Sequence, residues 1–451
     1  MSNGDHLRER QPFADYPDPR TPEQRAKDLQ AVRRQAGGFV QQQKDDSLER
    51  EMIAALQRRR ADRPDLVQFD VVAGRGRGGT RRTLVVRGEM LAEASLVERE
   101  GARRMLDKLG LVWEPIDCLQ GRVGRLKNAD IDSSRYVDLA RVVRRGGSAA
   151  SVNHITPLRP IMKWGSSGVE PSAVKVALAG PGAAGPSTPI VAVIDSGITD
   201  QSRSDGWLSN VARGGNIDLL DDLPSADGLL DFGAGHGTFA AGVVQQVAPD
   251  ADLRVYKALD SDGIGNEVDV ACAMVQAVTE GAQILNLSLG VQTIDDQPPV
   301  AIAAALDIIT EMTKGEVLVI AAAGNEGSTR PCWPAAFRQV VSVAALTADL
   351  TPADWSSRGF WVDCSTVGEG ILSTYPEGVE SPELDPQPDS FGADAWAVWT
   401  GTSFAAPQIA GAVARIAGER GITAREALRE LLLGGRQIPD FGIGVAILPG
   451  T

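Results

Sequence analysis

The chain has 451 residues and a formal net charge of −14, from 45 basic and 59 acidic side chains. Hydrophobic residues make up 43% and charged residues 23% of it, which is typical of a globular protein and excludes a disordered or collagen-like chain. Its apolar runs, such as residues 317–323, are much shorter than the ~20 residues that cross a bilayer, and its polar first residues do not resemble a secretory signal. We therefore expect two or three domains, no membrane partner and a cytoplasmic location.

The first 64 residues are polar, and residues 22–60 favour helix with a break near Gly37-Gly38. We predict an exposed, partly helical extension over 1–64 that is open to partners. Residues 65–165 alternate between strand and helix signals in the order β-α-β-β-α-β, which predicts a small α+β domain of ferredoxin-like fold. Its predicted strands are 83–87, 112–119, 121–127 and 149–158, and its predicted helices are 95–109 and 132–145.

Residues 166–188 are rich in Gly, Ala and Pro, which indicates a linker. Beyond it, over 189–451, apolar runs without alternation are separated by segments that favour helix. This pattern is typical of an α/β fold, with a parallel sheet covered by helices on both faces. The predicted strands are 190–194, 253–256, 284–289, 317–322 and 340–344, and the predicted helices are 236–246, 267–280, 300–314 and 402–417.

The charge is distributed unevenly between these parts. Residues 1–180 carry 32 basic and 24 acidic residues, a balance of +8, whereas residues 181–451 carry 13 and 35, a balance of −22. One interpretation is that the basic part binds nucleic acid through the arginine triplet 58–60 and the Arg-Gly stretch 75–82. The other is that the two parts attract one another. Because no nucleic-acid-binding motif accompanies the arginines, we favour the second interpretation.

The chain has four cysteines, which are too few for a disulfide scaffold at this length. No two are spaced as in a Cys-x-x-Cys zinc motif. We therefore expect no structural zinc, and we expect Cys332 and Cys364 to be thiols.

Three polar residues stand where chemistry is often placed. Asp195 follows the apolar run 190–194, and the carboxyl ends of buried parallel strands carry functional groups in such sheets. His236 lies among glycines at the start of a helical segment, which leaves its ring accessible. Ser403 begins another helical segment, where unpaired N–H groups favour negative charge. Each also has an ordinary explanation, as a turn aspartate, a packed histidine and a capping serine, so none decides the function alone.

Together the three follow the order Asp, His, Ser, and their surroundings resemble the signature blocks of the subtilisin-like serine peptidases, the subtilases. The blocks are Ile-Asp-Ser-Gly at 194–197, His-Gly-Thr at 236–238 and Gly-Thr-Ser-Phe-Ala-Ala-Pro at 401–407. Two more segments, 285–290 and 321–327, resemble the family's substrate-edge strand and the block that carries its oxyanion asparagine. One departure is Phe404, where the family usually has Met after the nucleophile.

The resemblance implies a serine endopeptidase that hydrolyses peptide bonds through an acyl-enzyme intermediate and needs no cofactor. Ser403 is the nucleophile, His236 the general base, and Asp195 the group that orients the imidazole. Asn325 donates to the oxyanion. The residues that line a bound protein or peptide substrate are Ser288, Leu289, Gly290, Ala323 and Gly324.

The order of elements in 65–165 also resembles the propeptide domain of many subtilases, which implies that this domain restrains the enzyme as an intramolecular inhibitor. An adaptor or a fold-stabilising lobe is the alternative. Two other functions remain open for the whole chain: a catalytically silent subtilase-fold binding protein, and a nucleic-acid-binding protein. Calcium is possible as a surface ion, because an acidic run offers oxygen ligands, although a solvated loop is the simpler interpretation. The run contains Asp218, Asp221, Asp222 and Asp227.

Overall fold

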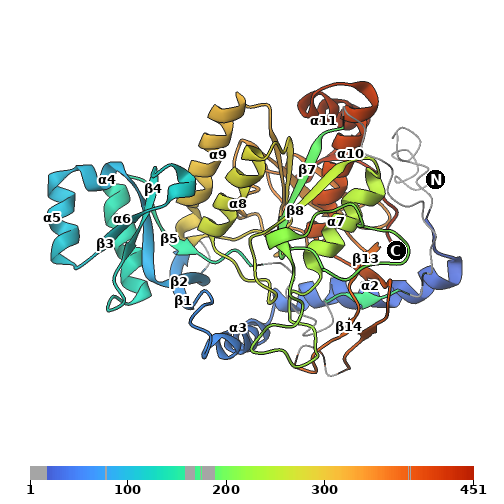
Figure 1. Cartoon of the computed structure of the whole chain (residues 1–451), viewed down its shortest axis with the longest axis horizontal. Coiled ribbons are helices and arrows are strands. Elements are labelled where there is room, and N and C mark those ends of the chain that lie inside the picture. Colours follow the sequence, from blue (N-terminus) through green and yellow to red (C-terminus); the bar gives the residue numbers. More distant parts are fainter. Residues whose placement is uncertain are drawn as a thin grey trace.

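The computed structural model describes residues 18–76, 79–157, 168–172, 174, 188–383, 385 and 387–451. Most of the predicted linker 166–188 therefore lies outside the described residues. The first elements described are two long helices, α2 (Pro22–Gln42) and α3 (Asp46–Arg60); in Figure 1, α2 crosses the lower right of the molecule and α3 lies near its lower edge.

Helix α2 is continuous through Gly37 and Gly38, where the sequence predicts a break. Thr21 caps its first turn, and its buried residues recur every three or four positions up to Phe39. That face packs on residues of the region 188–451, so tertiary contacts outweigh the weak helix propensity of glycine. The prediction of an exposed extension is wrong for α2.

The next unit is an antiparallel sheet (Figure 1) in which β5, β2, β4 and β3 lie side by side, and β1 pairs with the first half of the long strand β2. Alternate residues of β2 face opposite ways: Met90 packs on the unit's own helices, and Leu91 on the core that contains α8 and α9. The predicted strands are present, although that at 112–119 ends at Pro115, and β1 is additional. The predicted helix 95–109 is interrupted at Arg99, whose backbone is extended, and the ferredoxin-like classification stays a prediction. The elements are β1 (Phe69–Gly76), β2 (Gly79–Glu93), α4 (Ser95–Glu98), α5 (Glu100–Lys108), β3 (Val112–Pro115), η1 (Asp117–Leu119), β4 (Val123–Lys127), α6 (Ser133–Arg145) and β5 (Ala150–His154).

The main sheet has eight strands in the order β17-β18-β12-β11-β10-β9-β7-β8. All neighbours in it are parallel except the edge pair β17 and β18. The predicted parallel α/β sheet is confirmed, with one antiparallel edge strand added. Its strands are β7 (Ile190–Asp195), β8 (Asp252–Lys257), β9 (Ile284–Leu287), β10 (Leu318–Ala322), β11 (Val340–Leu346), β12 (Cys364–Val367), β17 (Arg436–Ile438) and β18 (Gly442–Gly444).

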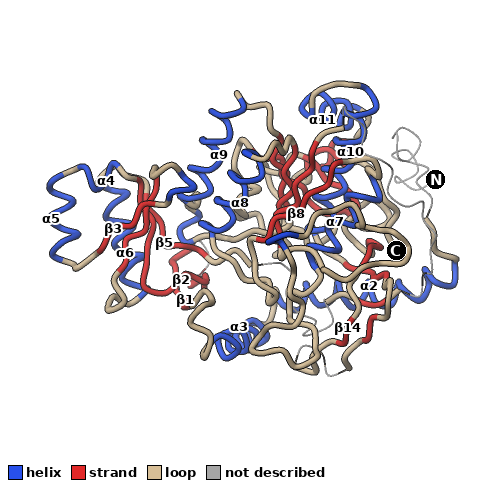
Figure 2. The backbone as a smooth tube through the Cα atoms, in the orientation of Figure 1, coloured by secondary structure: helices blue, strands red, loops and turns tan. Residues whose placement is uncertain are grey.

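Helices cover both faces of this sheet (Figure 2). Val191 and Val193 of β7 share a core with α7 (His236–Val247) and α10 (Thr402–Arg420), whereas Ala192 and Ile194 share one with α8 (Glu267–Thr279) and α9 (Val300–Thr313). Burial on both faces explains why the strands read as continuous apolar runs. Within the described part of the chain, no helix has the length and apolar content that a membrane crossing requires. The remaining elements are β6 (Glu170–Pro171), η2 (Gly214–Asn216), η3 (Ile294–Asp296), β13 (Ile371–Thr374), β14 (Gly378–Val379), β15 (Ser390–Phe391), β16 (Trp396–Trp399) and α11 (Ala424–Leu433).

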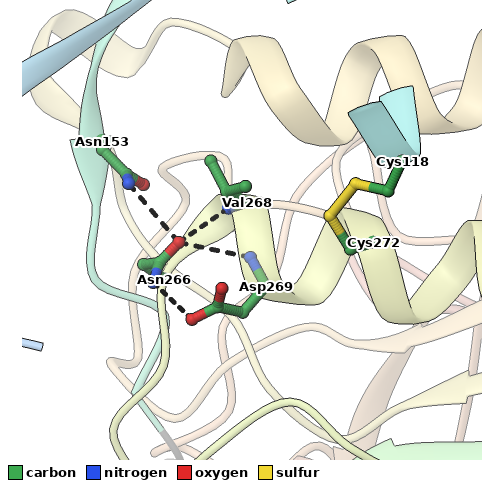
Figure 3. The surroundings of a disulfide bond; sticks show 6 residues. All are labelled: Cys118, Asn153, Asn266, Val268, Asp269 and Cys272. Carbon is green, nitrogen blue, oxygen red and sulfur yellow. Dashed lines mark hydrogen bonds between the residues drawn. A yellow bond between two sulfur atoms is a disulfide. The ribbon is translucent and has the colours of Figure 1, made fainter. Parts of the chain in front are cut away.

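A disulfide joins the α+β unit to the region of the main sheet. It links Cys118 in η1 to Cys272 in α8, with Cα atoms 5.4 Å apart (Figure 3). Beside it, Asn153 of β5 donates to the side chain of Asn266, the residue that caps α8, at 3.4 Å. Cys332 and Cys364 are buried thiols, as predicted, while the sequence offered no sign of the covalent link.

Two arginines of the triplet 58–60 are buried. Arg59 and Arg60, at the end of α3, are 6% and 1% exposed and form ion pairs with Asp262, which is fully buried. These side chains are therefore not a nucleic-acid-binding surface, and the structure favours attraction between the basic and acidic parts of the chain. Part of the stretch 75–82 lies outside the described residues.

Candidate active site

Asp195 is the last residue of β7 and is fully buried. Its Oδ1 accepts the backbone N–H of Ser196 at 2.7 Å and lies 2.8 Å from Nδ1 of His236. The strand end therefore places a carboxylate against one nitrogen of a buried imidazole, as the sequence predicts for this pair.

His236, the first residue of α7, reaches Asp195 because the residues on either side of it are glycines. Gly235, before it, has φ of 76°, and a Cβ there would lie 2.6 Å from Cδ of Pro376. A Cβ on Gly237, after it, would lie 2.1 Å from the carbonyl oxygen of Gly197. The glycines thus let the start of α7 press against the turn that follows Asp195.

A second buried carboxylate, Asp218, links the two segments. Its Oδ2 accepts the hydroxyl of Ser196 at 3.0 Å and the backbone N–H of Gly235 at 2.9 Å. The Ser196 hydroxyl in turn accepts the N–H of Gly237 at 3.1 Å. Burial raises the pKa of Asp218 to about 6. The sequence does not reveal this role, because the partners lie on segments that meet only in the fold.

The other aspartates of the acidic run have separate partners. The Asp221 carboxylate accepts the N–H groups of Asp227 and Gly228, at 2.9 and 2.8 Å, and Asp222 pairs with Arg63 at 3.2 Å. Among the residues that the structure describes, no group of three or more His, Cys, Asp or Glu side chains is arranged to hold a metal. Calcium binding by this run stays a prediction.

Ser403 is the second residue of α10 and is 2% exposed. Its hydroxyl donates to the carbonyl oxygen of Ser288 at 3.0 Å, and the Ser288 hydroxyl donates to the carbonyl oxygen of Ser403 at 2.7 Å. The next residue, Phe404, has its ring 5.3 Å from the ring of His236. The start of α10, the segment after β9 and the imidazole therefore meet at one place.

His236 Nε2, the ring nitrogen that faces away from Asp195, is buried and has no hydrogen-bond partner among the described residues. The ring is enclosed by aromatic side chains, with Trp399 edge-on at 5.2 Å and Phe404 packed in turn on Phe239 at 4.5 Å. The prediction of an accessible ring is wrong, because these aromatic side chains, which the motifs do not reveal, leave His236 fully buried.

Asn325 lies beside the start of α10. Its side-chain Oδ1 accepts the backbone N–H and the hydroxyl of Thr402, each at 2.9 Å. Because the amide oxygen is held by the residue before Ser403, the amide orientation is fixed relative to the serine. Thr402 is a site residue that the sequence did not single out.

The residues predicted to line a substrate flank this centre. Ser288 contacts Ser403 directly, and Leu289 is 2% exposed. Gly290 and Gly324 both approach the sulfur of Cys332, because a Cβ on either would lie 2.7 or 3.2 Å from it. The backbone N–H of Ala323 donates to Val343, and that of Gly324 to the Thr402 hydroxyl at 3.1 Å. The structure thus brings the two predicted segments to the same place, while their role in substrate binding stays a prediction.

Known proteins are similar to this chain in sequence. The sequence model of the subtilase family matches residues 187–436. The chain is 32% identical over 239 residues to subtilisin E of Bacillus subtilis, covering 50% of this chain and 54% of that protein. It is 30% identical over 239 residues to thermitase of Thermoactinomyces vulgaris, covering 51% and 75%. The chain thus spans about half the length of the first of these curated relatives.

Solved structures share the fold. Fervidolysin from Fervidobacterium pennivorans, described as a keratinolytic enzyme related to subtilisin, superposes with a TM-score of 0.57 at 20% identity, covering 84% of this chain and 62% of that one. The epidermin leader peptide processing serine protease of Staphylococcus aureus gives a TM-score of 0.51 at 16% identity, covering 80% and 97%. With more than half of its residues matched by the family's sequence model, the chain belongs to the subtilase family.

Proposed function

We propose that the chain is a serine endopeptidase that hydrolyses peptide bonds with Asp195, His236 and Ser403. The observation that carries the proposal is the buried contact of 2.8 Å between His236 Nδ1 and Asp195, inside the region that matches the subtilase family. Asp195 holds the imidazole with Nδ1 protonated and stabilises the imidazolium, which leaves Nε2 as the base.

On this proposal Ser403 changes its hydrogen bond before it reacts. Its hydroxyl donates to the Ser288 carbonyl, and His236 Nε2 has no hydrogen-bond partner among the described residues. A rotation about the Cα–Cβ bond of Ser403 turns the hydroxyl toward the imidazole. His236 then takes the proton as the oxygen attacks the substrate carbonyl, and later returns a proton to the leaving amine. Water hydrolyses the resulting acyl-enzyme by the same route.

The developing oxyanion has two donors on this proposal. The backbone N–H of Ser403 points out of the start of α10, where helix N–H groups lack partners within the helix. The side-chain NH₂ of Asn325 is the second, because Thr402 fixes the amide by its oxygen. The substrate is an extended peptide that pairs with the segment 288–290 as an added strand.

We also propose that the α+β unit restrains the enzyme from within the same chain. Two features of its contact with the catalytic region support this: the disulfide Cys118–Cys272 and the packing of β5 against the start of α8. The buried ion pairs of α3, which precedes the unit in the chain, are a separate attachment to the same region. The segment 158–168, which this proposal places in the active-site cleft, lies almost wholly outside the described residues. Disulfides such as this one form in oxidising compartments, so the oxidation state of Cys118 in cells also tests the predicted cytoplasmic location.

Labelling with a fluorophosphonate tests the activity. The purified chain is expected to react at Ser403, and the Ser403→Ala variant is expected not to react. Mass spectrometry after incubation then shows whether the chain is cut between residues 163 and 188 and whether Ser403→Ala stays whole. Because an inhibiting segment would also block the reagent, absence of labelling favours the catalytically silent binding protein only in a folded chain that has been cut between residues 163 and 188.

A further inference from the structure

Helix α2 lies outside the residues 187–436 that match the subtilase family, yet it reaches the segment that carries the proposed nucleophile. Gln35, in its fourth turn, is fully buried. Its Nε2 donates to the carbonyl oxygens of Gly168 at 2.8 Å and Val398 at 3.0 Å, and its Oε1 accepts the hydroxyl of Thr400 at 2.7 Å. One side chain from α2 thus satisfies three polar groups next to the active site.

The contact at Thr400 lies close to the proposed chemistry along the chain. Thr400 also accepts the backbone N–H of Gly370 at 3.1 Å, so its hydroxyl is held from two sides. After Gly401, the next residue is Thr402, which binds the amide oxygen of Asn325, and Ser403 follows. The segment 398–403 is therefore held at one end by Gln35 and at the other by Asn325.

The other end of α2 lies against the oxyanion segment. Phe39 stacks on Trp355 with ring centroids 4.9 Å apart, and Gln43, just past the helix, donates to the backbone carbonyl of Asn325 at 3.4 Å. Gln35, Phe39 and Gln43 are spaced four residues apart, so one face of the chain segment contacts both halves of the site.

We propose that Gln35 is a positioning residue that holds the loop 398–403 so that Ser403 and Asn325 face the same substrate carbonyl. This inference rests on the proposed serine peptidase function. A small displacement of a nucleophile slows the reaction strongly, because attack requires the reacting atoms to be within contact distance and correctly oriented. On this proposal α2 is a working part of the enzyme and stays bound to it after any cut near the linker.

The test compares Gln35→Met, which keeps the side-chain volume and removes both the NH₂ donor and the carbonyl acceptor of the amide, with a control variant on the same helix. Asp28→Ala removes two other buried polar contacts of α2, the hydrogen bond from the Ser172 hydroxyl at 3.0 Å and the ion pair with Arg20 at 3.5 Å, and neither partner belongs to the loop. Both variants are assayed on a peptide substrate, with active sites counted by fluorophosphonate labelling. We expect kcat per labelled site to fall about tenfold or more in Gln35→Met with KM within about twofold, and no such fall in Asp28→Ala.

Thr400→Val is the second variant, because it removes the hydroxyl that binds Gln35 and leaves α2 unchanged. It is expected to lower kcat in the same way, and it decides the question if Gln35→Met fails to fold. Unchanged kcat per labelled site in both loop-facing variants, or an equal loss in Asp28→Ala, overturns the inference and leaves the peptidase function standing. A wild-type chain that is folded, has been cut between residues 163 and 188 and is still not labelled overturns the proposed function and this inference together.

Discussion

The buried arginine at the end of α3 allows a quantitative prediction. Arg60 is 1% exposed, and its guanidinium pairs with Asp262 at 2.9 Å and also contacts Asp260. Asp262 is fully buried, and both of its carboxylate oxygens also accept the Nε–H of Arg59 at 3.1 Å. The Arg60→Met variant keeps an apolar side chain of similar length, but the carboxylates of Asp260 and Asp262 lose a positively charged partner.

We expect Arg60→Met to lower the free energy of unfolding by about 3 kcal/mol. Breaking a buried ion pair from one side typically costs about 3–5 kcal/mol, and the low end applies because Arg59 still neutralises Asp262. Burial already raises the pKa of Asp260, whereas Arg60 lowers it, so removing Arg60 raises it further. A carboxyl group whose folded pKa is raised destabilises the fold as pH rises through that pKa, so the loss is larger at pH 8 than at pH 5.

The measurement is urea unfolding in the Ser403→Ala background, which prevents self-digestion, at pH 5 and pH 8. The control is Arg58→Met, two residues earlier in α3. Its guanidinium lies 3.2 Å from Glu383, and the two side chains are 65% and 38% exposed. An exposed pair contributes little, so the control is expected to unfold like its parent. The reasoning fails if Arg60→Met loses less than about 1 kcal/mol at pH 8, or if Arg58→Met loses as much.

Three further predictions concern the site and its attachments. In Asp218→Asn the free energy of unfolding should depend less on pH. The folded pKa of about 6 exceeds the ordinary 3.8, so the wild-type carboxyl group lowers the free energy of unfolding by about 3 kcal/mol as the pH rises from about 4 to about 6. Urea titrations across that range should show that the variant lacks this slope. Asn325→Ala should lower kcat roughly 10²–10³-fold with little change in KM; this range is carried over from the corresponding donor of a subtilisin, and an unchanged kcat would exclude Asn325 as an oxyanion donor. Once the chain is cut between residues 163 and 188, the N-terminal fragment should stay with the wild-type enzyme on denaturing gels without reductant and separate in Cys118→Ser; separation in both would show that the disulfide is absent in solution.

Local patterns in the sequence predict a large part of this protein. Apolar runs buried on both faces identify β7 to β11 within a residue or two, and the helices between them follow from the same pattern. The sequence singles out Asp195, His236 and Ser403 because each stands at a strand end or a helix start, where the short motif around it determines the local geometry. Gly235 and Gly237 belong to such a motif, since no other residue fits there.

Contacts between segments far apart in the chain were decided only by the tertiary structure. Nothing near Gln35 shows that its amide meets Thr400, 365 residues away, and nothing near Cys118 shows that it pairs with Cys272. The arginines at 58–60 look alike in the sequence, yet one is solvated and two are buried, because only folding places the carboxylates of Asp231 and Asp262 beside them. The identity of an arginine or a glutamine does not reveal its partner, because the same N–H donors can bind water, nucleic acid or a buried carboxylate.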